Sequence, residues 1–211
     1  LLFHNNRDGS FTKITNDVVV GDAGDWRAAS WADYDNDGHV DLFVTGNTAN
    51  GFAAQNELFR NNGDGTFTKM ASSAVGAIVP GGGESEGCLW ADYARDGFLD
   101  MYVSRYGIDW LFRNNGDGTF SDVSAKSGIN KPRLNYGLAS IVSDFDHDGW
   151  PDIYVACDSS ANILFRNQRD GTFADLAIVS GTAFNDDGME QAGMGLSVGD
   201  YDHDGLFDLL K

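Results

Sequence analysis

Two short motifs alternate along the 211 residues of the chain. The first has the form D-x-D-x-D-G-x-x-D, and its copies span 33–41, 92–100, 144–152 and 200–208. The second has the form L-F-R-N-N-G-D-G-T-F, and its copies, including a variant at the start, span 2–11, 58–67, 111–120 and 164–173. Motifs that recur in this way restrict the fold to an array of similar units, because one such unit cannot bury its apolar face alone.

Each repeat is predicted to contain four short β-strands. A small apolar strand leads into the first aspartate, as at 28–32, and an alternating strand follows the aspartate loop, as at 40–44. The third strand is Leu-Phe-Arg-Asn and the fourth begins with Thr-Phe. The glycine-rich segment between them tolerates the positive φ angles of a tight hairpin. Four antiparallel strands repeated in this way predict an all-β propeller whose blades are four-stranded sheets.

The aspartate loops have the composition of a site for a hard, oxygen-seeking cation. Carboxylates at positions 1, 3, 5 and 9, glycine at position 6 and the backbone carbonyl of position 7 can together supply the oxygens that Ca²⁺ prefers. Thiolate and imidazole side chains are absent from positions 1, 3, 5 and 9, which disfavours zinc and copper. The candidate ligands in three complete loops are Asp33, Asp35, Asp37, His39 and Asp41; Asp144, Asp146, Asp148, Trp150 and Asp152; and Asp200, Asp202, Asp204, Leu206 and Asp208.

The second loop is incomplete, because Ala94 replaces one carboxylate and Arg95 adds a positive charge beside the site. It offers Asp92, Asp96, Phe98 and Asp100, and we expect weak or no metal binding there. Three strong Ca²⁺ sites are therefore expected, with a fourth weak or absent. The loops differ from an EF-hand, because position 12 is not Glu and a strand follows. The alternative interpretation is a set of Asp/Gly turns held by side-chain hydrogen bonds without metal.

The paired motifs resemble FG-GAP/VCBS repeats, which are similar to the calcium-binding blades of integrin α-subunit propellers. The stretch from Gly193 to Leu210 is similar to repeats in bacterial ASPIC/UnbV-type proteins. The resemblance covers nearly the whole chain. It implies a β-propeller, commonly seven-bladed, with Ca²⁺ at the aspartate loops. It also implies an extracellular or cell-surface binding role.

The chain is expected to form a single propeller region over residues 1–211. In this division a half blade occupies 1–32, repeats begin near 33, 92 and 144, and a second half blade ends at 211. Two arrangements are compatible with the repeats. The half blades could join into a closed four-bladed ring, or the chain could be an arc of a larger propeller. We favour the arc, whose bare edge strands would need cover from other chains or from further propeller sequence.

Charge and hydropathy exclude two classes of protein. The chain has 14 Lys and Arg against 32 Asp and Glu, a formal charge of −18, so it lacks the basic surface of a nucleic-acid binder. It contains no apolar run of about 20 residues that could span a membrane. Cys88 and Cys157 could form one bridge, but two small buried side chains are the simpler interpretation.

No catalytic constellation is evident, and the four histidines occupy repeat positions. We therefore expect a non-catalytic module that binds a protein or glycan at its variable loops, in an extracellular, periplasmic or cell-surface location where Ca²⁺ is abundant. A carbohydrate-binding lectin is one alternative. A propeller-type polysaccharide-active enzyme is another, which would need an acid/base pair in the loops, with Glu84, Glu86 or Glu190 beside Tyr136 or Arg133.

Overall fold

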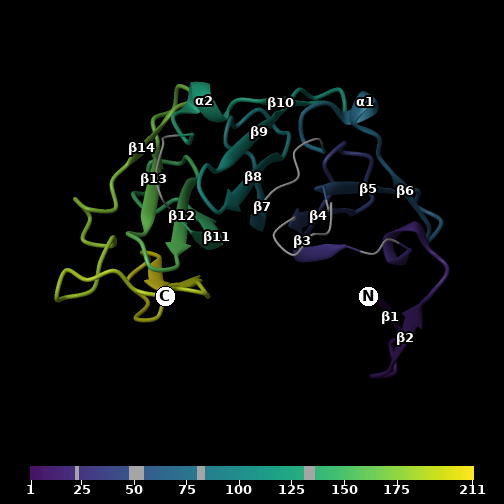
Figure 1. Cartoon of the computed structure of the whole chain (residues 1–211), viewed down its shortest axis with the longest axis horizontal. Coiled ribbons are helices and arrows are strands. Elements are labelled where there is room, and N and C mark those ends of the chain that lie inside the picture. The colour runs from purple at the N-terminus through teal and green to yellow at the C-terminus, as the bar shows by residue number, and fades with distance from the viewer. Residues whose placement is uncertain (22–23, 48–54, 80–83, 131–135) are drawn as a thin grey trace.

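The computed structural model describes residues 1–21, 24–47, 55–79, 84–130 and 136–211. They form three four-stranded antiparallel sheets and two two-stranded sheets (Figure 1). The strands are β1 (Leu2–Asn5), β2 (Phe11–Ile14), β3 (Asp25–Ala32), β4 (Asp41–Asn47), β5 (Glu57–Asn61), β6 (Phe67–Lys69), β7 (Ser85–Ala91), β8 (Asp100–Arg105), β9 (Trp110–Asn114), β10 (Phe120–Asp122), β11 (Gly137–Ser143), β12 (Asp152–Cys157), β13 (Ile163–Asn167), β14 (Phe173–Asp175), β15 (Ser197–Gly199) and β16 (Asp208–Leu210).

Helices are few and short in the described part of the chain. They are the 3-10 turn η1 (Val18–Val20), α1 (Ser72–Val75) and α2 (Ser124–Ser127). None of these described helices has the length or the apolar character that a membrane crossing requires. The structure therefore consists mainly of strands and the turns that join them.

Each four-stranded sheet corresponds to one repeat, as predicted. The aspartate loop closes the hairpin between the first and second strands, so that Ala32 pairs with Asp41 at its base. The glycine-rich motif closes the hairpin between the third and fourth strands, where Asn61 pairs with Phe67. The same order recurs in β7 to β10 and in β11 to β14. These sheets are called blades one, two and three below.

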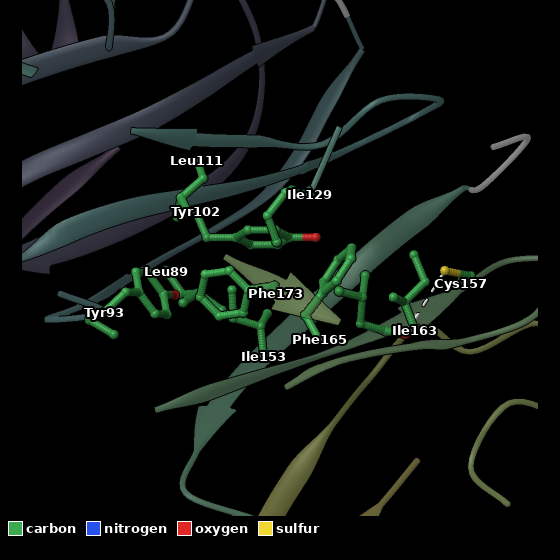
Figure 2. Close-up of a cluster of buried hydrophobic side chains, with 12 residues drawn as sticks. Leu89, Tyr93, Tyr102, Leu111, Ile129, Ile153, Cys157, Ile163, Phe165 and Phe173 are labelled. Atoms are coloured by element: carbon green, nitrogen blue, oxygen red, sulfur yellow. Dashed lines mark hydrogen bonds between the residues drawn. The ribbon is translucent and has the colours of Figure 1, made fainter. Parts of the chain in front are cut away.

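Adjacent blades pack through their apolar faces, and β7 contacts both β3 and β11. One buried cluster joins blades one and two, and it includes Tyr34 and Phe43 from blade one and Met101 from blade two. A second cluster joins blades two and three, and Figure 2 shows Tyr102 and Leu111 lying over Ile153 and Phe165. Because strand side chains alternate between the two faces, each blade can bury one face against each neighbour.

The alternative of a closed four-bladed ring is wrong. β1 pairs with β2 and β15 pairs with β16, as two separate two-stranded sheets. The three blades, which pack together through the two buried clusters, form an arc. The two small sheets lie at its opposite ends (Figure 1). Some of their large apolar side chains stay in solvent, with Phe11 62% and Leu210 71% exposed.

The same geometry separates two tryptophans at equivalent positions. Trp90 packs against Tyr34, Phe43 and Phe120. Trp31 lies against Phe67 but is 48% exposed. The difference follows from the array, because a complete blade precedes the blade of Trp90, whereas only β1 and β2 precede β3. No disulfide joins Cys88 and Cys157.

Candidate metal centre

The four aspartate loops have one backbone conformation. The residue at position 4 adopts a left-handed conformation with φ between 54° and 63°, in Asn36, Arg95, His147 and His203. Position 6 is glycine with φ of 87° or 88° in every copy. A side chain at such a φ is strained, which explains why glycine occupies this position. The chain reverses direction at these two positions.

The aspartate at position 1 closes the loop from inside. Asp33 Oδ1 accepts a hydrogen bond from the Asp37 N–H at 3.0 Å, and its Oδ2 accepts one from the Gly38 N–H at 2.9 Å. The equivalent pairs of bonds recur at Asp92, Asp144 and Asp200. The position 1 carboxylate therefore shapes the loop in addition to charging it.

The aspartate at position 9 ties the loop to the third strand. Asp41 Oδ2 accepts from the Tyr34 N–H at 3.2 Å, and Oδ1 accepts from the Asn61 N–H of β5 at 2.8 Å. Asp100 and Asp152 make the same two connections. In the last loop Asp208 accepts from the Tyr201 N–H.

Burial raises the pKa of Asp41, Asp100 and Asp152 to about 6. Their side chains are nearly inaccessible to water, and this desolvation outweighs the backbone hydrogen bonds that favour the charged form. Neighbouring carboxylates of the same loops act in the same direction as burial. A nearby positive charge would therefore relieve a real electrostatic cost at this position.

Three of the loops bring carboxylates close enough to share one ion. Three oxygens, one from each residue, lie within 4.8 Å of one another in the groups Asp33, Asp35 and Asp37; Asp144, Asp146 and Asp152; and Asp200, Asp202 and Asp208. Within the described ranges, the second loop yields no such group. Its position 3 is Ala94, so Asp92, Asp96 and Asp100 lack the carboxylate that stands between them in the other copies.

A buried oxygen in the first loop tests whether these residues fit a cation. Asp35 Oδ1 is inaccessible to water and accepts no hydrogen bond from the described residues. An unpartnered buried carboxylate oxygen is costly, and a metal ion would satisfy it. The donor set consists of oxygens, as Ca²⁺ requires. The residues present therefore fit the expected ion.

Arginines of the third strand also reach the loops, which the sequence analysis did not predict. Arg60 in β5 donates from Nε to Asp35 at 2.6 Å and from Nη2 to Asp37 at 2.5 Å. Arg113 in β9 donates to Asp96 at 3.1 Å. Arg166 in β13 pairs with Asp146 and Asp148. The signal was present in the sequence, because Arg60, Arg113 and Arg166 occupy the same place in three copies of the second motif.

The residue at position 7 also connects parts of a blade. Its N–H donates to the position 5 carboxylate in all four loops, at distances of 2.8 to 3.2 Å. The side chains of His39 and Phe98 cover Gly63 and Gly116, where an added Cβ would come within 3.0 Å of the ring. The use of the position 7 carbonyls of His39, Phe98, Trp150 and Leu206 as ligands remains a prediction.

Position 4 makes contacts between successive loops. The Asn36 side chain donates to the Gly97 carbonyl at 3.2 Å. The Arg95 guanidinium lies 5.4 Å from the centre of the Trp150 ring, and His147 stacks on Phe207. Arg95 therefore contacts the next blade. The second loop's carboxylate Asp96 instead pairs with Arg113 of β9.

Two of the residues considered for an acid/base pair, Glu86 and Tyr136, serve other contacts. Glu86 accepts a hydrogen bond from Asn47 at 2.6 Å and lies 3.8 Å from Arg27, so it links blade two to blade one. Tyr136 packs edge-on against Tyr106. Arg133 lies outside the described residues.

Comparison with known proteins agrees with the repeats. The family described as FG-GAP-like repeat matches residues 1–44, 41–103 and 144–210, which confirms the resemblance inferred from the motifs. Cartilage acidic protein 1 of Xenopus tropicalis and of Mus musculus are each 26% identical over 197 residues, which cover 84% of this chain and 29% of the relative. The chain thus spans less than a third of the length of these relatives.

A solved structure is similar over nearly the whole chain. It is that of an Agrocybe aegerita lectin with specific recognition of non-reducing terminal N-acetylglucosamine. The TM-score is 0.55 and the identity 21%, over 98% of this chain and 53% of the lectin. This likeness concerns the fold alone, and it agrees with the predicted all-β, propeller-like arrangement of blades.

Proposed function

Because the chain belongs to the FG-GAP-like repeat family, we propose that it is a non-catalytic, calcium-stabilised β-propeller module that binds a protein or glycan. Residues 1–211 would act as one such region. The single observation that carries the calcium assignment is the first loop, where three carboxylates converge and Asp35 Oδ1 is buried without a hydrogen-bond partner. A convergence of three carboxylates in each of two further loops, there from positions 1, 3 and 9, supports it.

The residues that would hold the ions are those of the complete loops, with position 9 linking each site to the third strand. A bound Ca²⁺ would supply two positive charges where several carboxylates repel one another. The loop residues would then fix the hairpin between the first and second strands. Through Asp41 and Asp152 they would also fix the start of the second strand against Asn61 and Asn167 of the third.

A stabilising role predicts a location with abundant calcium. At a free Ca²⁺ concentration of about 100 times Kd, one site contributes roughly 2.7 kcal/mol to the free energy of unfolding. Open loops with modest affinity reach that ratio where Ca²⁺ is millimolar, as it is outside cells. We therefore propose an extracellular, periplasmic or cell-surface location, with the partner bound at the variable loops between blades.

The test is a calcium titration of chelator-treated protein. Calorimetry measures the binding, and the melting temperature measures the stability. We expect about three sites and a melting temperature that rises with Ca²⁺. Mg²⁺ serves as the control, because it dehydrates reluctantly and needs a stricter octahedral geometry, so it should stabilise less. An identical melting temperature in chelator and in millimolar Ca²⁺ would contradict the proposal.

A further inference from the structure

A pocket of about 360 Å³ lies at the boundary of blades two and three. Its lining comes from the incomplete aspartate loop, from β9 and the segment after β10, and from the loop and hairpin of blade three. The residues that matter here are Ala94, Arg113, Lys126, Trp150, Arg169 and Phe173. The volume is in the range of pockets that bind small ligands.

The residues that line the pocket carry more positive charge than the equivalent residues between blades one and two. Ala94 stands where blade one has Asp35, so a carboxylate is lost. Lys126 corresponds to Ser73, and Arg169 corresponds to Gly116 of the next blade, so two positive charges are gained. The changes at these three equivalent positions therefore make this place more positive than its counterpart, in a chain whose formal charge is −18.

The cations of the pocket keep unused donors. Arg113 pairs with Asp96 and Arg169 pairs with Asp148, yet both side chains are about half exposed, at 54% and 53%. A guanidinium has five N–H donors, and these pairs leave some of them available. Within the described part of the chain, the Lys126 ammonium makes no hydrogen bond or ion pair.

The two carboxylates of the lining are already occupied. Asp100 accepts hydrogen bonds from the backbone N–H groups of Tyr93 and Asn114. Asp170 accepts from the Thr172 N–H at 3.0 Å and from its hydroxyl at 2.6 Å. These two acids are therefore poor competitors for the cations, and the Lys126 ammonium and the remaining N–H donors of Arg113 and Arg169 can bind an anion from solution.

The floor of the pocket is apolar and aromatic. Leu111 and Phe173 belong to the buried cluster of Figure 2, where the Phe173 ring meets Tyr93 edge-on at 5.9 Å. Trp150 is half-buried at the wall. Aromatic and aliphatic surface beside a few charged donors suits a ligand that carries both an apolar ring face and an oxyanion.

We propose that this pocket binds an oxyanion-bearing sugar unit, with its charged group at Lys126, Arg113 and Arg169 and its ring against Trp150 and Phe173. The inference rests on the proposed function as a binding module and gives that function a site. A carboxylate, sulfate or phosphate on the sugar offers the same chemistry to these cations. The experiment separates these sources.

The test uses the whole chain in Ca²⁺, with binding followed by calorimetry and by the indole N–H signal of Trp150. The probes are glucuronate, glucose 6-sulfate, glucose 6-phosphate, glucose and inorganic phosphate. We expect the charged sugars to bind and to shift the Trp150 signal, and glucose to bind at least about tenfold more weakly, since a charge-assisted hydrogen bond contributes about 1.5–3 kcal/mol. The strongest of the three charged sugars identifies the preferred oxyanion.

The variant Lys126→Ser/Arg169→Gly gives the pocket the residues of its counterpart between blades one and two. It should lose at least about tenfold in affinity for the charged sugars. The matched control is Arg7→Gly/Lys13→Ser, which changes the net charge equally on the exposed β1–β2 hairpin, with Arg7 at the repeat position of Arg169. The control should bind as the parent does, and both variants should retain the parent's circular dichroism spectrum.

Three results would overturn the inference. They are no binding of any charged sugar, equal loss in the pocket and control variants, and binding of inorganic phosphate as tight as that of the sugars, which would mean an anion site without sugar recognition. Calcium binding is measured on the same samples. Calcium binding without sugar binding would defeat this inference alone, and the reverse result would defeat the calcium assignment alone.

Discussion

The first and second aspartate loops have the same backbone but different charge. In both, the position 1 carboxylate accepts from the N–H groups of positions 5 and 6. In both, the position 9 carboxylate is buried and joins the loop to the third strand. Yet the first loop gathers three carboxylates and the second does not.

The difference arises at positions 3 and 4, where Asp35 and Asn36 become Ala94 and Arg95. The second loop keeps its shape without the position 3 carboxylate. Positions 1, 5, 6 and 9 are the same in both loops and therefore build the loop, while position 3 adds charge that a cation would balance. The two kinds of position can be separated by experiment.

Replacement of the position 9 aspartate should have the largest effect, and it should be equal in the two loops. Asp41→Ala and Asp100→Ala each leave backbone N–H groups of the loop and of the third strand without an acceptor. We expect each to lower the free energy of unfolding by about 2–4 kcal/mol in chelator, measured by urea denaturation. The matched control is Asp35→Ala. If Asp35→Ala costs as much as Asp41→Ala, the division between shaping and charging positions is wrong.

The pH dependence of stability should follow position 9 as well. Burial raises the pKa of Asp41, Asp100 and Asp152 from 3.8 to about 6, so the folded protein binds more protons than the unfolded chain between these values. In chelator, stability should therefore fall as pH rises from about 4 to about 6 and level off above.

Urea denaturation across this pH range measures the effect. Asp41→Ala should remove one of the three contributions and so reduce the fall in stability. Asp35→Ala should reduce it less, because the Asp35 carboxylate is a smaller cause of the raised pKa of Asp41 than burial is. Carboxylates whose pKa is lowered by hydrogen bonds, such as Asp64 and Asp117, act in the opposite sense and lose their contribution below about pH 4. A stability that rises between pH 4 and 6 in chelator would contradict the prediction.

Restoring the second loop should add a calcium site. Ala94→Asp/Arg95→Asn gives it the residues of the first loop, and we expect one more Ca²⁺ per chain by calorimetry. In chelator the new carboxylate should cost about 1 kcal/mol, because it adds repulsion among partly exposed charges. The single change Arg95→Asn is the control, and it should leave the stoichiometry unchanged. An unchanged stoichiometry in the double variant would show that position 3 does not decide binding.

The sequence predicted what repeats within one unit. The hairpin at Ala32 and Asp41 and the four strands of each blade follow from glycine positions and period-2 alternation, which are local properties. It did not predict that Arg60 reaches Asp35, because that contact depends on how the third strand lies beside the loop. The exposure of Trp31 is likewise not a local property, since burial at its position depends on which sheet precedes the blade.

The smallest predicted effect concerns Arg60, which pairs with Asp35 and Asp37 and so competes with a cation for the same carboxylates. Arg60→Gln should raise the calcium affinity of the first loop several-fold, because an ion pair at a partly exposed site contributes about 1 kcal/mol or less. In chelator the same variant should lose a similar amount of stability. The control is Arg113→Gln in the second loop, which removes an arginine at the same position where Ala94 leaves too few carboxylates for a strong site. Calcium calorimetry on both variants measures the difference, and a lower affinity in Arg60→Gln would mean that the arginine orients the carboxylates for the ion instead of competing with it.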